Sequence, residues 1–544
     1  MATIVQLSDI HLDASERQAH ETIEPLIETL GLFRAGLGCP PDLLVITGDL
    51  FDNATIPLDR AVPQARGLLE RIDGALGRPM PTVILPGNHD RRLQGLLGPH
   101  RRSLFDGLRD ALGDRVHVAG CQTPFLAEVV PRSFHQLPAS VVCVDSTFVP
   151  TGLLGAGGML RQEDLLEIAD QLSDEPQDEP VVVLTHNHLI PTPLADLTRI
   201  DVSTGSRVFQ WLANKVLARL ISNADREEWM MTALGAGTAL STLHAIQRAL
   251  VVLHGHKHYP TVRALHGTSE DQGDLLLIGA GSAGLILGWD AGRDPDSASL
   301  WPSFNAIELS SEMLSVDSVV FMPRQGHQAP EPTRFAARAL VRARRDGTRW
   351  HVDPVSSAPT NTGPVVARNH ARYSLSANAE RPRQRWDAEV ERTVTYAEGP
   401  PVEAYVESID AAPGSHLSDI RIGSHTVKKH HLPITLRLPA DGTPARFRIT
   451  GGLCRSLDET AAAYGPLGAF EWVELLNRYQ CREVALVLEG LPPGIRAFGS
   501  AIDLTCGQER PARVVREVAR TVLTVRECPP GTLLRILWRP DHPW

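Results

Sequence analysis

The sequence has no apolar run as long as the ~18 residues that a membrane-spanning helix needs. The nearest candidate, residues 275–287, is short and interrupted by glycines. The N-terminus has neither a basic segment nor a small-residue cleavage pattern, so no secretory signal is expected. The sequence therefore predicts a cytoplasmic protein without a membrane partner.

Paired cysteines and an excess of positive charge are also missing. Seven cysteines are spread between Cys39 and Cys528 with no CxxC pair, which disfavours a zinc ribbon or a disulfide framework and predicts free thiols. The net charge of −11 disfavours non-specific nucleic-acid binding by the whole surface, although it leaves a local basic groove open.

Short apolar runs alternate with amphipathic stretches over the first three hundred residues. The runs are rich in Val, Ile and Leu and do not alternate with polar residues, which is typical of strands covered on both faces. We expect strands at residues 3–7, 43–47, 82–85, 141–144, 181–184, 250–253 and 275–278. Apolar residues at three- and four-residue spacing predict helices at residues 20–33, 58–72, 162–172 and 207–220. This alternation predicts an α/β layered domain.

The composition changes further along the chain. We expect a first domain over residues 1–320, a linker and hairpin extension over residues 321–389, and a C-terminal domain over residues 390–544. Phe335 to Val352 is expected to form a hairpin around Asp346-Gly347. The last region is predicted to be α+β or mainly β, with helical character only at residues 457–479.

Five short segments rich in histidine and aspartate each follow one of the apolar runs. They are Ser8-Asp9-Ile10-His11, Gly48-Asp49-Leu50-Phe51-Asp52, Gly87-Asn88-His89-Asp90, Thr185-His186-Asn187-His188 and Gly255-His256-Lys257-His258. The carboxyl ends of strands in α/β sheets are where sites form. Carboxylate, imidazole and amide groups without thiolates are typical of a centre for Mn, Fe or Zn, and this set is large enough for two ions.

Charge and reach divide these ligands into two sets that share one carboxylate. One divalent ion is expected at Asp9, His11, Asp49 and His258, and the other at Asp49, Asn88, His186 and His256. If the chain remains extended after the first strand, Asp9 and His11 point at the same ion.

Two cations ~3.5–4 Å apart clamp a phosphoryl group and provide a bridging hydroxide that attacks phosphorus in line. His89 is then left as a catalytic group beside the metals, where it can stabilise the transition state or protonate the leaving oxygen. Asp90 is expected to hold the His89 ring in the right tautomer, and Asp52 to orient a ligand such as His11.

Several neighbouring residues have competing interpretations. His186 directly follows its strand and is favoured over His188 as a ligand, and His254 is expected to pack within its strand. Two basic runs, residues 338–349 and 428–431, are expected to be solvated surfaces rather than anion sites.

The order DxH, GDxxD, GNHD, H and GHxH, carried by these five segments, resembles the calcineurin-like metallophosphoesterase superfamily over roughly residues 1–320. The resemblance implies a four-layer α/β/β/α sandwich with a binuclear metal site between its loops. It also implies Asp49 as the bridging ligand, His89 as the catalytic histidine and a phosphoester as the substrate.

Residues 141–146 with 158–162, and residues 278–282 with 304–308, resemble the cyclic-nucleotide phosphodiesterase branch of this superfamily. The chain departs from that branch at Asn187 and His188, where the branch has a second histidine and a proline. The segment Gly48 to Asp52, with Pro57 after it, also resembles the nuclease subunit of bacterial double-strand-break repair complexes.

Three hypotheses follow. The favoured one is a metal-dependent phosphoesterase that prefers a phosphodiester or nucleotide. The second is a DNA or RNA nuclease acting with a partner, and the third is a metal-binding scaffold that recruits a protein through residues 390–544. A non-ligand histidine such as His89 argues against the scaffold, which has no use for it.

Overall fold

The computed structural model describes two regions of the chain. In the first it covers residues 1–13, 18–52, 56–91, 103–119, 127–147, 158–190, 232–258, 260–267, 269, 272–284, 302–321 and 335–353. In the second it covers residues 365–377, 386–398, 405–407, 416–422, 425–427, 434–436, 445–453, 471–477, 480–491, 494–503, 508–517, 520–528 and 532–538. The predicted helix at residues 207–220 and the basic run 428–431 lie outside these residues.

An eight-stranded sheet forms the centre of the first region, in the order β14-β13-β12-β11-β1-β2-β3-β4. Its strands are β1 (Ala2–Leu7), β2 (Leu43–Thr47), β3 (Thr82–Leu85), β4 (Val116–Val118), β11 (Ser303–Leu309), β12 (Met313–Phe321), β13 (Phe335–Asp346) and β14 (Arg349–Asp353). Strands β1 to β4 are parallel, whereas β11 pairs antiparallel with β1 and begins a run of antiparallel neighbours. The last pair forms the predicted hairpin, which turns at Gly347 with a φ of 57°.

A second sheet of six strands has the order β5-β6-β7-β8-β10-β9. Its strands are β5 (Ala127–Val129), β6 (Ser140–Val144), β7 (Val181–Leu184), β8 (Leu250–His254), β9 (Thr261–Leu265) and β10 (Leu275–Gly279). The outer strands β5 and β9 are antiparallel, and the four between them are parallel.

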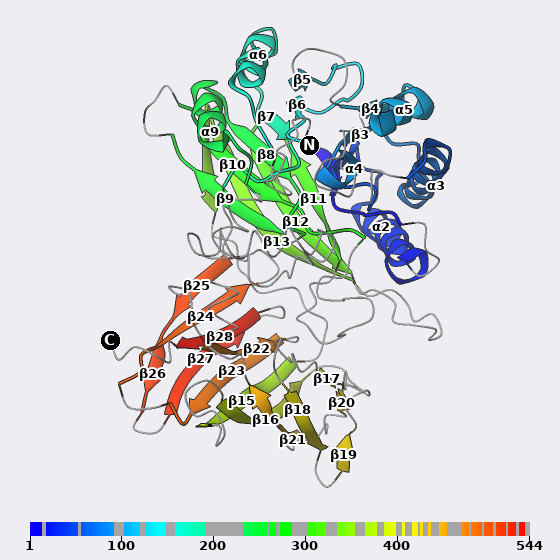
Figure 1. Cartoon of the computed structure of the whole chain (residues 1–544). Helices are drawn as coiled ribbons and strands as arrows, with labels where there is room; N and C mark the ends of the chain where they lie inside the picture. The colour runs from blue at the N-terminus through cyan, green and yellow to red at the C-terminus, as the bar shows by residue number, and fades with distance from the viewer. Residues whose placement is uncertain are drawn as a thin grey trace, which may run out of the picture.

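Helices cover the outer faces of both sheets. The described helices are η1 (Ala19–Ile23), α2 (Glu24–Leu37), α3 (Leu58–Leu76), α4 (Asn88–Arg91), α5 (Ser103–Leu112), α6 (Gln162–Ser173) and α9 (Ala236–Ala245). Figure 1 shows α2, α3 and α5 on one side of the strands and α6 and α9 on the other.

Strand β1 shows how the sequence divides its side chains among these layers. Ile4 contributes to the apolar core between the two sheets. Val5 and Leu7 pack instead with the core under α2, α3 and α5, and a third core lies between the second sheet and helices α6 and α9. Every residue of β1 is buried, and apolar side chains lie on both of its faces. The expected four-layer α/β/β/α sandwich is confirmed.

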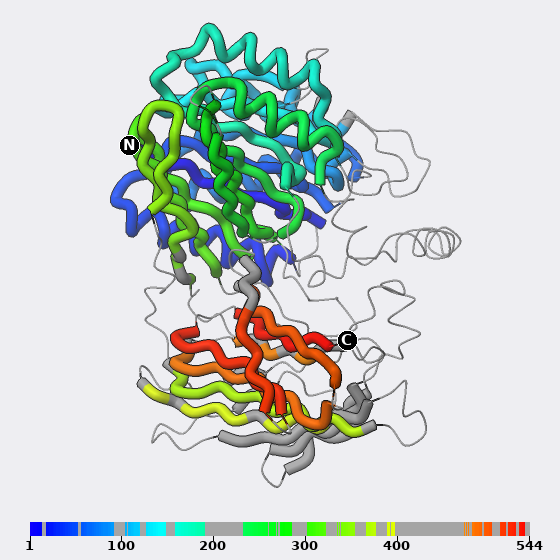
Figure 2. The backbone as a smooth tube through the Cα atoms, turned by 90° about the vertical axis from the view of Figure 1, so that its left-hand side faces the viewer, coloured from blue at the N-terminus to red at the C-terminus, as the bar shows by residue number. Residues whose placement is uncertain are grey.

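The C-terminal region is mainly β. Its largest sheet has the order β19-β18-β21-β16-β15-β23-β27-β26, a four-stranded sheet has the order β22-β28-β24-β25, and β17 pairs with β20. The strands are β15 (Val365–Ala377), β16 (Trp386–Glu398), β17 (Tyr405–Glu407), β18 (His416–Ile422), β19 (His425–Val427), β20 (Ile434–Leu436), β21 (Ala445–Leu453), β22 (Glu471–Asn477), β23 (Gln480–Glu489), β24 (Ala497–Asp503), β25 (Gln508–Ala512), β26 (Val514–Arg516), β27 (Arg520–Cys528) and β28 (Thr532–Trp538). Strands of the two larger sheets share one apolar core, and Figure 2 shows them as a separate group.

Two expectations differ from the observed elements. The helical character expected for residues 457–479 is wrong at residues 471–477, which form β22, while residues 454–470 lie outside the described chain. Strands β13 and β14 extend the first sheet, whereas β15 and β16 belong to the C-terminal sheets. We therefore propose a single domain boundary within residues 354–364 in place of those at 320 and 389.

None of the helices in the described part of the chain is long and apolar enough to cross a membrane.

Candidate dinuclear metal centre

The five histidine- and aspartate-rich segments follow the carboxyl ends of five strands that belong to both sheets. Strands β1, β2 and β3 of the first sheet lead into the first three segments, and β7 and β8 of the second sheet lead into the other two. The two sheets pack face to face, and their strand ends bring together all seven of the ligands predicted from the sequence.

The first group contains Asp9, His11, Asp49 and His258, whose ligand atoms all lie within 4.8 Å of one another. His11 Nε2 lies 3.3 Å from His258 Nε2, and His258 Nε2 lies 3.4 Å from Asp9 Oδ1. This is the first of the two predicted ligand sets.

The second group contains Asp49, His186 and His256, again within 4.8 Å. Asn88 joins it, because its Oδ1 lies 3.0 Å from His186 Nε2. His186 Nδ1 faces the Thr47 carbonyl oxygen at 2.8 Å, and a proton donated there leaves Nε2 for a metal.

Asp49 belongs to both groups. Its Oδ2 lies 3.3 Å from His186 Nε2 and 3.8 Å from His11 Nε2, while its Oδ1 accepts a hydrogen bond from the His89 backbone at 2.8 Å. One oxygen is therefore held by the backbone and the other faces both ligand sets, which is the arrangement that a bridging carboxylate needs.

The backbone at the centre is strained. Five non-glycine residues of the predicted ligand set have a positive φ: Asp9 (52°), His11 (52°), Asp49 (51°), His256 (77°) and His258 (64°). The chain after β1 is thus left-handed at both ligands and does not remain extended there. Such conformations cost of order 1–3 kcal/mol each and cluster at functional sites.

Glycines in these segments make room for side chains from other segments. A Cβ on Gly48 would lie 2.2 Å from His186 Nδ1, one on Gly87 would lie 2.1 Å from Asp49 Oδ1, and one on Gly255 would lie 1.8 Å from Ser8 Oγ. Because of these close approaches, the segments fit together only where the side chain is a hydrogen.

His89 lies beside the metal ligands, with its ring centroid 4.7 Å from that of His11. Its Nδ1 faces the backbone carbonyl oxygen of Asp52 at 2.9 Å. Burial acts to lower the pKa of His89, but the negative charge of Asp49 and the bond to Asp52 outweigh burial and raise that pKa above its usual value.

Asp90 has a different position from the one expected. Its carboxylate accepts hydrogen bonds from the backbone N–H groups of Gly87 (2.8 Å), Phe51 (2.8 Å) and Leu50 (3.1 Å). It thus ties the second segment to the third, and the contact that orients the His89 ring comes from the Asp52 carbonyl. The Asp52 carboxylate lies 3.6 Å from His11 Nδ1.

The charges of the buried ligands favour cation binding. Burial acts to raise the pKa of Asp9, but His258 and His186 outweigh it and lower that pKa to about 2. The pKa of Asp49 is held well below its usual value because His186 and His89 outweigh burial. Both carboxylates are therefore ionised at neutral pH.

The sequence did not reveal one buried ion pair next to the centre. Arg91 directly follows the third segment and pairs with Asp145, which follows β6, and both side chains are almost wholly buried. Thr147 donates to Asp145 Oδ1 at 2.8 Å. The signal that was available is the position of Asp145 at the carboxyl end of an apolar run.

His188 lies beside the centre but outside both ligand groups. It is buried, its ring centroid lies 4.3 Å from that of His254, and neither of its ring nitrogens has a hydrogen-bond partner. His254 is buried in β8, where it was expected.

The basic stretch of β13 and β14 is engaged in structural contacts. Arg342 pairs with Asp317 at 2.6 Å, Arg349 pairs with Asp274 at 3.0 Å, and Arg345 donates to the carbonyl oxygens of Ser311 and Asp178. These contacts support the interpretation that it is not an anion site.

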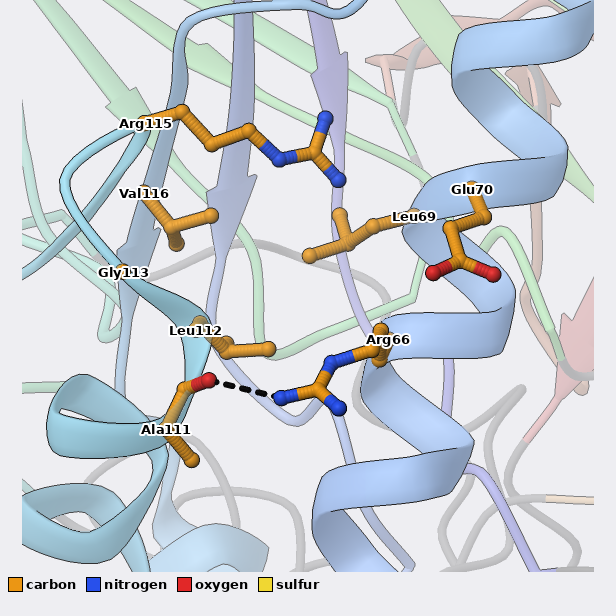
Figure 3. Close-up of a pocket in the computed structure, with 8 residues that line it drawn as sticks. All are labelled: Arg66, Leu69, Glu70, Ala111, Leu112, Gly113, Arg115 and Val116. Carbon is orange, nitrogen blue, oxygen red and sulfur yellow. Dashed lines mark hydrogen bonds between the residues drawn. The ribbon is translucent and has the colours of Figure 1, made fainter.

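A cavity of about 240 Å³ lies elsewhere, between α3 and the chain from α5 to β4 (Figure 3). Its lining includes Arg66, which donates to the Ala111 carbonyl at 2.8 Å, and Arg115, which pairs with Asp73. It contains none of the predicted site residues.

The ligand set fits divalent cations. Its donors are carboxylate, imidazole and amide groups without a thiolate, which suits Mn, Fe or Zn. His256 Nε2 is buried with no hydrogen-bond partner, as expected for an atom that a metal would bind. The layered fold and this candidate centre are typical of the class of dinuclear metallohydrolases.

A comparison with known protein families supports this class. Residues 2–260 match the family model described as calcineurin-like phosphoesterase. The match indicates that the chain is a hydrolase.

Three solved structures resemble the chain at low identity. A dimetal phosphatase from Danio rerio is 13% identical, with a TM-score of 0.36, over 58% of this chain and 95% of its own. A 5'-nucleotidase precursor from Thermus thermophilus is 15% identical, with a TM-score of 0.30, over 59% of this chain and 54% of its own. A single mutant of Vps29 from Entamoeba histolytica is 8% identical, with a TM-score of 0.23, over 62% of this chain and 98% of its own. No curated protein matches the sequence.

Proposed function

We propose that this chain is a binuclear metal-dependent phosphoesterase that prefers phosphodiesters, with nucleotides as the favoured class. The observation that carries the proposal is the position of Asp49, whose Oδ2 faces a histidine of each ligand group. When bound, two divalent cations would hold and polarise the phosphoryl oxygens and lower the pKa of water at the centre.

Asp9, His11, Asp49 and His258 would hold one cation, and Asp49, Asn88, His186 and His256 the other. The backbone N–H of His256 donates to Asp9 Oδ2 at 2.9 Å, so a ligand segment of the second sheet also positions a carboxylate of the first. Asp9 therefore keeps its orientation independently of a metal.

His89 is the residue that we assign to the leaving group. Since its Nδ1 faces the Asp52 carbonyl, Nε2 is the ring nitrogen left for substrate. The 4.7 Å between its ring centroid and that of His11 supports a role beside the first ligand group, where a leaving oxygen would receive a proton.

The preference for a diester is supported by the resemblance of residues 141–146 and 304–308 to the phosphodiesterase branch. Purified protein loaded with Mn²⁺ should hydrolyse bis(p-nitrophenyl) phosphate faster than p-nitrophenyl phosphate. Single-stranded DNA in the same panel tests the nuclease hypothesis. Cleavage of DNA with both small esters left intact would support that hypothesis over the proposed one.

The residue assignment is tested by two variants. Asp49→Asn should abolish tight binding of two ions, and His89→Ala should lower kcat by about 10²–10⁴-fold while both ions still bind. A matched control is His117→Gln, because His117 pairs with Glu128 away from the centre. Full activity in either site variant would show that these roles are assigned wrongly.

A further inference from the structure

The layer between the two sheets is apolar except at the end next to the metal centre. Ile4 of β1 and Ile307 of β11 are paired on adjacent strands of the first sheet, and both are buried in this layer. The next pair on the same face, closer to the ligands, is Gln6 and Asn305, and neither side chain is exposed. Two amides thus occupy positions where the pattern would place aliphatic residues.

These two amides connect the sheets through hydrogen bonds. Asn305 Nδ2 donates to Gln6 Oε1 at 3.0 Å and to the Gly279 carbonyl of β10 at 3.2 Å. Gln6 Nε2 donates to Thr47 Oγ1 at 3.2 Å and to the His254 carbonyl of β8 at 3.1 Å. Both NH₂ groups therefore have two acceptors, and each contacts one strand of the opposite sheet.

Both acceptor carbonyls stand where a strand of the second sheet enters the centre. His254 directly precedes Gly255 and His256. Gly279 precedes the turn in which Ser282 donates from its hydroxyl to the Asp9 carbonyl at 2.6 Å and from its backbone to the His258 carbonyl at 3.0 Å. The amides thus hold the end of β8, which leads into the segment of His256 and His258, and the end of β10, whose following turn bonds to Asp9 and His258.

Each ligand group draws on both sheets. The first combines three residues that follow strands of the first sheet with His258, and the second combines Asp49 with His186 and His256. The separation of the sheets at this edge consequently sets the distances within both groups.

Stability alone does not account for the pair. A buried amide has to recover its desolvation cost through hydrogen bonds, and an apolar pair of similar size often packs as well. Asn305 Oδ1 is buried without a hydrogen-bond partner, so the arrangement leaves the desolvation of one acceptor without compensation.

We propose that Gln6 and Asn305 are positioning residues, which hold the two sheets at the separation that both metal ions require. This inference rests on the proposed function, because it acts through the metal ligands. It differs from a role in catalysis, since the hydrogen bonds of both amides go to atoms that are not proposed metal ligands.

The experiment measures Mn²⁺ binding to the full chain by isothermal titration calorimetry, and the coupling of the two ions by electron paramagnetic resonance. Asn305→Leu and Gln6→Met keep volume and remove the bridge between the sheets. We expect both variants to fold, with Mn²⁺ affinity reduced about 10–100-fold and the signal of coupled ions weakened. The exchanged pair Gln6→Asn with Asn305→Gln restores an amide at each position and should recover part of the affinity.

Ile307→Val is the matched control. It alters the same layer at the Ile4–Ile307 pair, which is next to the Gln6–Asn305 pair on this face and farther from the metal centre. It should lower the midpoint of thermal unfolding and leave Mn²⁺ affinity and the coupled signal as in the original protein. An equal loss of affinity in this control would overturn the proposal, since any change in the layer would then have that effect.

Two further results would overturn it. One is unchanged Mn²⁺ affinity and coupling in folded Asn305→Leu and Gln6→Met, and the other is failure of both to fold, which would make the pair structural. If the original protein itself binds no Mn²⁺, the proposed function fails, and this outcome is distinct from the other two.

Discussion

Replacing Gly87 by alanine should disable the centre through the bridging ligand. The new Cβ would lie 2.1 Å from Asp49 Oδ1 and 2.2 Å from the Asp49 backbone nitrogen, and real contacts of a Cβ are not shorter than 3.0 Å. The two residues must therefore separate by roughly 0.9 Å. Because one of the atoms in conflict is backbone, a change of rotamer cannot relieve the contact.

That displacement exceeds the ~0.5 Å within which a functional site must be held. A misplacement of about 1 Å costs on the order of 10²-fold in rate, which corresponds to about 2.7 kcal/mol of transition-state stabilisation. We expect Gly87→Ala to lower kcat/KM for an aryl phosphodiester by this factor and to weaken Mn²⁺ binding. Overpacking should also lower the free energy of unfolding by about 1–3 kcal/mol.

Gly67→Ala provides the control. Gly67 lies within α3, and a Cβ there has nothing within 4 Å. This variant should be more stable by about 0.5–1 kcal/mol, with unchanged kinetics. Steady-state kinetics, calorimetry and urea unfolding measure the three quantities, and a Gly87→Ala enzyme within about threefold of the original kcat/KM would refute the reasoning.

Three other predictions concern the surroundings of the centre. Asp145→Asn removes one partner of the buried ion pair with Arg91 and should lower the free energy of unfolding by about 3–5 kcal/mol. Urea titration measures this quantity, and a change below about 1 kcal/mol would contradict the prediction. Burial acts to raise the pKa of Asp274, but bonds from the Trp350 and Gly267 backbones and from His266 and Arg349 outweigh it and lower that pKa below 3.8. The stability that this ionised carboxylate contributes is present above pH 3.8 and is lost as pH falls through the folded pKa. In urea unfolding, the loss of unfolding free energy caused by Asp274→Asn should therefore be constant between about pH 5 and 7 and become smaller below about pH 3.8. A loss that becomes larger in acid would contradict this prediction. Removing metal with EDTA should lower the midpoint of thermal unfolding, because bound ions offset the repulsion of Asp9 and Asp49, and re-addition of Mn²⁺ should restore it.

The sequence predicted the parts of the fold that depend on local pattern. The apolar runs matched β1, β2, β3, β6, β7, β8 and β10, and the amphipathic stretches matched η1 with α2, α3 and α6. The ligand segments could be placed because each directly follows such a run, so that a correct strand fixes the position of its ligand.

The parts that were missed depend on non-local contacts. The partner of Arg91 is Asp145, which lies 54 residues away, and nothing local links the two. The left-handed backbone at Asp9 and His11 depends on hydrogen bonds to the second segment, since Asp9 N donates to the Gly48 carbonyl and His11 N to the Asp49 carbonyl. Neither is visible in the order of residues.

The error at residues 471–477 has a similar cause. Glu and Leu in the sequence EWVELLN favour a helix, but Val473, Leu475 and Asn477 are buried at alternate positions. Pairing with β28 provides the backbone hydrogen bonds, so the strand prevails over local propensity.

Because β11 is a central strand of the first sheet, that sheet can be completed only after residues 303–309 have been synthesised. Gln6 and Asn305 are bonded neighbours although 299 residues separate them, and the family match ends at residue 260, before β11 begins. A ribosome adding about 5–20 residues per second needs roughly 15–60 s to make the intervening chain. Throughout that time β1 has an open edge, and the amide bridge to the second sheet is incomplete. A shortened chain that ends where the family match ends should therefore aggregate during synthesis, although it carries every predicted metal ligand.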